Sequence, residues 1–272
     1  MPLFWLRVAV AFYAAGLLYA LALLGRRAES WRRIIMPIVS LGMVFHFVSL
    51  TEAARIERVT LASVHYSESL LAFLIMFVFM VVRVKYKTTS PGLFIFPIVF
   101  LLTFASAMAQ APVALANPLL RNGWVFAHIA LIFTGYAALF LSFGASLLYL
   151  LQTRALKGKA SPQAAVASRL PSLETLDEIG YKSLLLGFPF ITVGLVAGAA
   201  IAQVKYGPVY FHDPKVMLSL LLWVVYVVLL YTRWNNGWRG RRAACLAALG
   251  FAVALGAWAA NYFSSLHRFV AP

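Results

Sequence analysis

Residues 181–203 read YKSLLLGFPFITVGLVAGAAIAQ, an apolar run without an acidic residue and with a single cation, Lys182. The hydrocarbon core of a bilayer is crossed by about 20 mostly apolar residues in an α-helix, so we expect a membrane-spanning helix here. The whole chain shares this character, because 63% of its 272 residues are apolar and 11% are charged. An ordinary soluble domain has roughly 45–50% apolar and 25% charged residues. The sequence therefore predicts an integral membrane protein.

Other stretches of the chain are similarly apolar and similarly long. Together with residues 181–203, the predicted spans are, in chain order, about 4–24, 34–50, 66–84, 91–110, 123–151, 181–203, 214–232 and 242–263. The first stretch exceeds the apolar core of a signal peptide, so we expect it to be retained as a span. The sequence thus predicts an all-α integral membrane protein, a single polytopic domain of residues 1–272 built as a bundle of about eight transmembrane helices.

The positions of the lysines and arginines predict the orientation of this bundle. Sixteen of the 23 basic residues lie at one set of alternate helix ends, in or near the loops 26–33, 83–90, 152–180 and 233–241. Basic residues concentrate in cytoplasmic loops, so we expect these loops inside and both termini outside, in a bacterial inner (cytoplasmic) membrane. The net charge of +15 then sets topology and does not indicate a nucleic-acid partner. In the 152–180 loop, the residues from Ser172 onward begin like a capped interfacial helix.

Five histidines lie on the side that is predicted to be outer: His46, His65, His128, His212 and His267. Imidazole is a ligand for heme iron, zinc and copper and also carries protons. An interfacial histidine can equally serve only as a hydrogen-bonding residue, and this alternative stays open for His46 and His65. The lone cysteine, Cys245, excludes an intramolecular disulfide and a CxxC redox pair. The chain also has no HxxxH zinc spacing, nucleophile elbow or phosphate loop.

Heme fits this inventory better than zinc or copper, because two histidines from different helices can bind iron while aromatic rings pack on the porphyrin. Trp124 and His128 lie four residues apart on one helix face, and Gly135 offers a surface for close helix approach. Residues 205–215 (KYGPVYFHDPK) combine aromatic rings, a turn and cations. Basic residues can pair with the propionates, and further candidates for this role are Arg55, Arg58, Arg121 and Arg268.

Several segments resemble the cytochrome c assembly (CcsA/HemX-like) family: residues 176–182 (LDEIGYK), 187–198 (GFPFITVGLVAG), 206–215 (YGPVYFHDPK) and 222–233 (LWVVYVVLLYTR). The family's outer loop is a tryptophan-rich heme-handling motif that ends in Trp-Asp-Pro-Lys-Glu and is flanked by two histidines. By position these are His128 and His267. The resemblance implies a b-type, non-covalent heme with these two side chains as axial ligands. The heme-binding residues that it implies are Trp124, His128, Tyr206, Tyr210, His212, Asp213, Lys215 and His267.

The sequence also departs from the family pattern. The motif's tryptophans are replaced by Tyr206, Tyr210 and His212, and Val216 stands where an acid is usual. Tyr231 occupies the place of a membrane histidine that heme-transporting members carry. The resemblance therefore supports the outer heme site more directly than a second site within the membrane.

Three functions remain as hypotheses. The first is a heme-binding assembly factor, not expected to be an enzyme, that presents heme to apocytochrome c together with a second membrane subunit. The second is a HemX-type regulator whose 152–180 loop contacts glutamyl-tRNA reductase in tetrapyrrole synthesis. The third is a small-solute transporter, which usually needs polar residues near mid-membrane.

Overall fold

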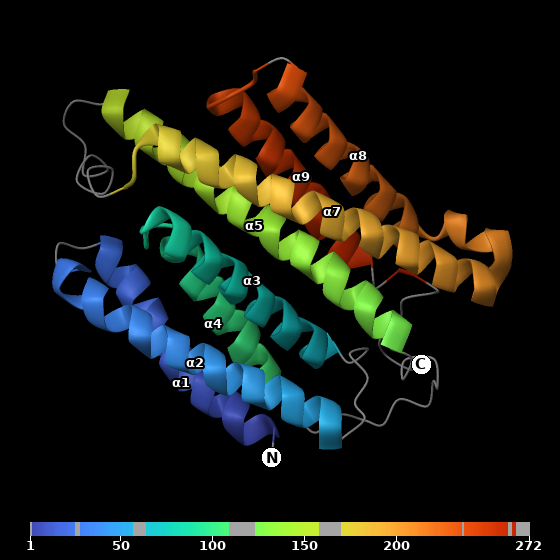
Figure 1. Ribbon diagram of the computed structural model, residues 1–272, viewed down its shortest axis with the longest axis horizontal. Helices are drawn as coiled ribbons and strands as arrows, with labels where there is room; N and C mark the ends of the chain where they lie inside the picture. Colours follow the sequence, from blue (N-terminus) through green and yellow to red (C-terminus); the bar gives the residue numbers. More distant parts are fainter. Residues whose placement is uncertain are drawn as a thin grey trace. The chain divides into compact units, whose positions relative to one another are not determined.

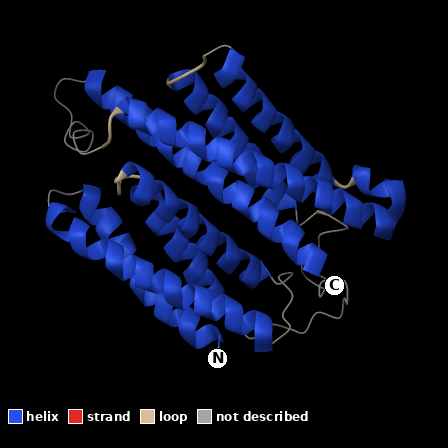
Figure 2. Ribbon diagram, in the orientation of Figure 1, coloured by secondary structure: helices blue, strands red, loops and turns tan. Residues whose placement is uncertain are grey.

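A computed structural model describes residues 2–24, 28–56, 64–108, 123–157, 170–235, 237–260 and 263–264. The regular structure in these ranges is helical throughout, with no strand among them (Figure 2). The helices are α1 (Pro2–Leu24), α2 (Ala28–Ile56), α3 (Val64–Tyr86), α4 (Gly92–Met108), α5 (Gly123–Lys157), α7 (Leu173–Tyr206), the 3₁₀-helix η2 (Gly207–His212), α8 (Pro214–Asn235) and α9 (Arg241–Ala259). A helix underlies each of the eight predicted spans.

Seven of the described helices are long and apolar enough to cross a membrane, namely α1, α2, α3, α5, α7, α8 and α9. The remaining long helix, α4, has 17 residues and is equally apolar in character. The predicted fold class, an all-α multi-pass membrane protein, is confirmed. The chain divides into two compact units, which we call unit 1 (residues 1–116 and 155–171) and unit 2 (residues 117–154 and 172–272).

Unit 1 contains α1 to α4, the blue to teal helices of Figure 1. Helix α1 packs against α2 and α4, and α3 packs against α4. The core between them is rich in large side chains, among which Tyr13, Tyr19, Phe79 and Phe96 are fully buried. The Tyr19 hydroxyl lies 3.1 Å from the Thr89 hydroxyl, so the polar end of a buried ring has a partner within the same unit.

Unit 2 contains α5 up to residue 154, then α7, η2, α8 and α9. Its core joins all four long helices and consists of Leu139, Leu184, Ile191, Leu222, Tyr226, Leu229, Leu230 and Ala254. The Tyr226 hydroxyl of α8 donates to the Gly135 carbonyl of α5 over 2.9 Å. Trp223 of α8 donates its indole N–H to the Thr192 hydroxyl of α7 over 3.0 Å.

Helices α5 and α7 are longer than a bilayer requires. They have 35 and 34 residues, or roughly 50 Å each at 1.5 Å per residue, against a hydrocarbon core of about 30 Å.

The start of α7 confirms the predicted cap at Ser172. Ser172 caps the helix, and its hydroxyl accepts the Thr175 N–H over 3.2 Å. The helix is longer than the predicted span 181–203, since α7 runs without a break from Leu173 to Tyr206. Gly180 lies within this helix beside α5, where an added Cβ would be 3.7 Å from the Ser142 carbonyl oxygen, an ordinary contact distance.

Candidate functional site

His128 is held in one orientation by the neighbouring helix. Its Nδ1 lies 2.7 Å from the Gly194 carbonyl of α7. A carbonyl oxygen only accepts, so Nδ1 carries the proton and Nε2 of the neutral ring keeps its lone pair. Among the described residues Nε2 has no hydrogen-bond partner. Histidines that bind metals are typically oriented in this way, by an N–H donated from the other ring nitrogen.

Glycines on α7 create the space for this ring. Gly198 lies directly against it, because a Cβ at this position would come within 2.5 Å of the His128 Cε1 atom. Gly194 faces Ile132 of α5, and a Cβ there would lie 2.9 Å from the Ile132 Cδ1 atom. Gly187 likewise faces Ala138, at 2.9 Å. Small residues allow membrane helices to approach closely, so this α7 surface, which we call the glycine seam (Gly187, Gly194 and Gly198), seats the His128 ring.

The predicted close-approach surface at Gly135 is confirmed. A Cβ at Gly135 would lie 3.0 Å from the Ile191 Cβ and 3.3 Å from the Ile191 backbone nitrogen. Glycines on both helices therefore allow the α5 and α7 backbones to approach closely: Gly135 on α5 and the glycine seam on α7.

Asp213 connects the start of α8 with the segment that follows α9. Its Oδ1 accepts the Lys215 N–H over 2.9 Å, and its Oδ2 accepts the Ser264 hydroxyl over 2.7 Å. The carboxylate is 5% exposed and Ser264 is fully buried. Together with Pro214 at the first helical position, this is a favourable start for a helix. Both carboxylate oxygens of Asp213 thus have protein partners, and the predicted contact of Asp213 with heme stays a prediction.

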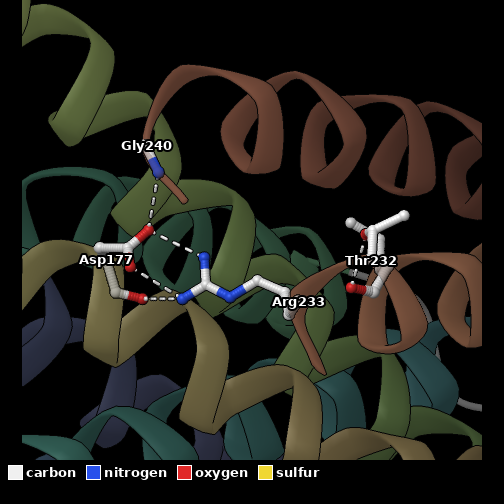
Figure 3. Close-up of polar contacts among 5 residues, drawn as sticks. Asp177, Thr232, Arg233 and Gly240 are labelled. Carbon is white, nitrogen blue, oxygen red and sulfur yellow. Dashed lines mark hydrogen bonds and ion pairs between the residues drawn. The ribbon is translucent and has the colours of Figure 1, made fainter. Parts of the chain in front are cut away.

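A second polar cluster lies at the other end of unit 2. The Arg233 guanidinium binds both carboxylate oxygens of Asp177, at 2.8 and 2.9 Å, and the Asp177 carbonyl at 3.2 Å (Figure 3). The Gly240 N–H also donates to Asp177, over 3.1 Å. The Arg233 guanidinium lies 4.7 Å from the centroid of the Tyr181 ring. Asp177 and Arg233 both lie in segments that carry the family resemblance, but the sequence analysis did not pair them. The only signal for the pairing in the sequence is their opposite charges.

Residues 61–266 match the family model described as cytochrome C assembly protein. The chain belongs to this family. Among its relatives, the cytochrome c biogenesis protein CcsA of Guillardia theta is 30% identical over 194 residues, which cover 64% of each chain. CcsA of Porphyra purpurea is 29% identical over 71% of this chain and 72% of its own. CcsA of Parasynechococcus marenigrum is 36% identical over 50% of this chain and 51% of its own.

These relatives bear on the hypotheses from the sequence. The chain spans slightly less than two thirds of the length of the Guillardia protein and about half of the Parasynechococcus protein. All three are named for cytochrome c biogenesis. They give no support to the HemX-like regulator of glutamyl-tRNA reductase or to the small-solute transporter.

The cytochrome c assembly match includes His128 and ends one residue before His267. His267 lies outside the described residues, as do Arg58, Arg121 and Arg268. Tyr206 is the last residue of α7 and Tyr210 lies in η2, and their side chains are outside the description. The predicted 205–215 loop is mostly helical in the structure. Helix α7 ends before Gly207 (φ +62°), the 3₁₀-helix η2 follows, and α8 begins at Pro214.

The other predicted residues differ in exposure. Trp124 is the second residue of α5 and is 71% exposed, His212 is exposed, and Lys215 is half-buried. Arg55, a propionate candidate, lies exposed in the last turn of α2 in unit 1. His65 is the second residue of α3. His46 is fully buried in unit 1, with its two ring nitrogens 3.3 Å from the Tyr13 hydroxyl and 2.8 Å from the Ser69 hydroxyl.

His128 fits an axial role toward a heme iron, whereas His46 does not. The His128 ring is oriented by a backbone carbonyl and keeps Nε2 for a ligand bond, and an exposed aromatic ring, Trp124, lies one turn away. Both nitrogens of His46 already have hydroxyl partners in a fully buried setting. These contacts support the hydrogen-bonding alternative for His46.

Proposed function

We propose that this protein acts in cytochrome c biogenesis and holds a b-type, non-covalent heme at the outer membrane face, between His128 and His267 and beneath residues 205–215. The observation that carries the proposal is the hydrogen bond from His128 Nδ1 to the Gly194 carbonyl. This bond fixes the tautomer and aims Nε2 before any ligand arrives, so little ordering entropy remains to be lost on binding.

Other residues of unit 2 support this arrangement. The glycine seam holds the His128 ring against α7, so the ligand nitrogen cannot swing away with a rotamer change. Asp213 fastens Ser264, three residues before His267 along the chain, to the start of α8. Lys215 provides a cation for a propionate, while Trp124, Tyr206, Tyr210 and His212 supply rings for the porphyrin. Heme itself is the cargo, an iron porphyrin to be delivered to an apocytochrome.

The proposal also concerns the setting of the protein. We infer that both units work as one polytopic domain in a bacterial inner membrane with both termini outside. The partners in this proposal are apocytochrome c and a second membrane subunit of cytochrome c assembly, with the lipid bilayer as solvent. The excess of basic residues at the predicted cytoplasmic loops supports this orientation.

The test is an absorbance spectrum of the purified chain, oxidised and reduced, for the native protein, His128→Gly and His267→Gly. We expect a six-coordinate, low-spin bis-histidine spectrum in the native protein and its loss in each variant, with partial recovery on adding free imidazole. Acid–acetone extraction should remove the heme, because the bond is non-covalent. Unchanged heme content and spectra in both variants would refute the proposal.

The matched control is His46→Gln, which alters a fully buried histidine whose nitrogens both have protein partners. It should leave the heme spectrum as in the native protein. Loss of heme in this variant at unchanged thermal stability would place the ligand in unit 1 and contradict the assignment to His128.

A further inference from the structure

The connection between α8 and α9 is basic, aromatic and short. Residues 233–242 read RWNNGWRGRR, with four arginines, two tryptophans and no acidic residue. Both flanking helices are candidate membrane spans, Pro214–Asn235 and Arg241–Ala259. A connection of only residues 236–240 between two spans has to lie at the membrane surface. We call residues 233–242 the Arg/Trp loop.

Bonds within unit 2 fix the shape of this loop. Asp177 binds the Arg233 side chain at its start and the Gly240 N–H near its end. The Trp238 N–H donates to the Thr232 carbonyl over 3.1 Å. Gly237 and Gly240 have φ angles of +58° and +66°, which residues with a Cβ rarely adopt. The loop is therefore preorganised by the protein itself.

The four arginines of the loop differ in their contacts and in their exposure. Arg233 is neutralised by Asp177, and the exposed fractions of the two side chains are 8% and 18%. Arg239, Arg241 and Arg242 are all exposed, and the Arg242 guanidinium lies 5.6 Å from the centroid of the Trp238 ring. Trp234 is 72% exposed, and its indole N–H donates to the Tyr181 hydroxyl. Three cations and an aromatic ring thus face outward from a fixed turn.

We propose that the Arg/Trp loop binds the phosphate of an anionic phospholipid headgroup through Arg239, Arg241 and Arg242. The planar guanidinium fork matches phosphate oxygens in a two-bond geometry, and tryptophan side chains settle at the level of the headgroups. Phospholipid is the occupant because the ends of two spans hold the loop in the plane where headgroups are concentrated. The proposal is independent of heme, since it concerns different residues at the other end of α8 from Asp213 and Lys215.

The test measures lipid binding to the full-length protein in neutral detergent by native mass spectrometry, with phosphatidylglycerol and phosphatidylcholine as probes. The variant is Arg239→Gln/Arg241→Gln/Arg242→Gln. One cation near an anionic surface contributes about 1 kcal/mol, or roughly 5-fold in affinity. We therefore expect phosphatidylglycerol to bind roughly 100-fold more weakly to the triple variant, and phosphatidylcholine, whose choline cation offsets the charge of its phosphate, to lose much less affinity.

The matched control, Arg83→Gln/Lys85→Gln/Lys87→Gln, removes the same charge from the end of α3 in unit 1. It should retain native phosphatidylglycerol affinity within twofold. Equal weakening in both triple variants would show a general charge effect and overturn the proposal, as would unchanged affinity in the loop variant. If the triple variant fails to fold, the single variant Arg241→Gln should still weaken binding roughly 5-fold, and an unchanged affinity there would also overturn it.

Discussion

His46 in unit 1 and His128 in unit 2 both lie on apolar helices, but their rings have different surroundings. Two side-chain hydroxyls from α1 and α3 contact the nitrogens of His46, and the residue is fully buried. Among the described residues, the hydrogen-bond partner of the His128 ring is one backbone carbonyl, and the ring rests on a glycine rather than between hydroxyls. The same residue type thus joins three helices in one unit and presents a ligand atom in the other. The number of ring nitrogens with partners separates the two roles.

The packing of the two units differs in a related way. Unit 1 fills its core with large rings such as Tyr13, Phe79 and Phe96. Unit 2 brings α5 and α7 together along the glycine seam and carries a polar clamp toward each end, at Asp177 and at Asp213. Close backbone approach leaves few rotamers to reposition, so residues on the seam are held more firmly than residues in an aromatic core. A ligand histidine benefits from that rigidity.

The largest expected loss of stability concerns the Asp177–Arg233 ion pair of unit 2, which has no charged counterpart in the hydrogen bonds of His46 in unit 1. Asp177→Asn removes one partner of a bidentate ion pair and leaves the Arg233 guanidinium largely buried. We expect a loss of about 3–5 kcal/mol in the free energy of unfolding, the usual cost of breaking a buried pair. Denaturation in mixed micelles with rising dodecyl sulfate measures it.

Glu174→Gln is the control, because Glu174 is an exposed acid in the first turn of the same helix. It should cost less than about 1 kcal/mol through the helix dipole. A similar loss in both variants would show that charge on α7, and not the clamp, stabilises unit 2.

The comparison of the two histidines is tested by His46→Leu. This variant leaves the Tyr13 and Ser69 hydroxyls buried without their shared partner, so we expect a loss of about 2–3 kcal/mol in unfolding free energy. Heme content per folded molecule should stay at the native value. His128→Leu should show the reverse, a small change in stability and loss of heme, and any exchange of these two outcomes would contradict the assigned roles.

Much of the fold follows from composition, because long apolar runs in a bilayer have few alternatives to helices. The helices under the eight predicted spans were accessible for this reason, and the Ser172 cap was accessible from the local sequence that follows it. The close packing of α7 along the glycine seam was not, since a glycine shows its packing role only when the facing helix is known. For the candidate site, the order of residues and the family resemblance pointed to His128, but the carbonyl partner of its Nδ1 lies on another helix and could not be predicted. The Asp177–Arg233 pair escaped prediction because its members lie 56 residues apart, and only the packing of α7 against α8 brings them together.

The glycine seam is tested by Gly187→Ala. A Cβ at Gly187 would lie 2.7 Å from the Tyr226 hydroxyl and 2.9 Å from the Ala138 Cβ. We expect a loss of about 1–2 kcal/mol in unfolding free energy, because α5 and α8 must both shift. Gly144→Ala on α5 is the control, since nothing lies within 4 Å of its added Cβ, and it should be neutral or slightly stabilising. Equal effects would remove the argument that α5 and α7 need bare backbone at Gly187.

The smallest expected effect concerns the hydrogen bond from the Trp223 indole to the Thr192 hydroxyl, which joins α8 to α7. Trp223→Phe keeps an aromatic ring beside Phe188 but removes the donor, and Thr192→Val removes the acceptor. Interhelical hydrogen bonds in membranes contribute about 0.6 kcal/mol on average. We expect a value of this size here, because the Thr192 hydroxyl also donates to the Phe188 carbonyl and keeps a partner when the indole is removed. A double-mutant cycle in mixed micelles should return a coupling of this size. A coupling above about 2 kcal/mol would mean that side-chain hydrogen bonds, and not the close approach of small residues, hold unit 2 together, and the contrast with unit 1 would then disappear.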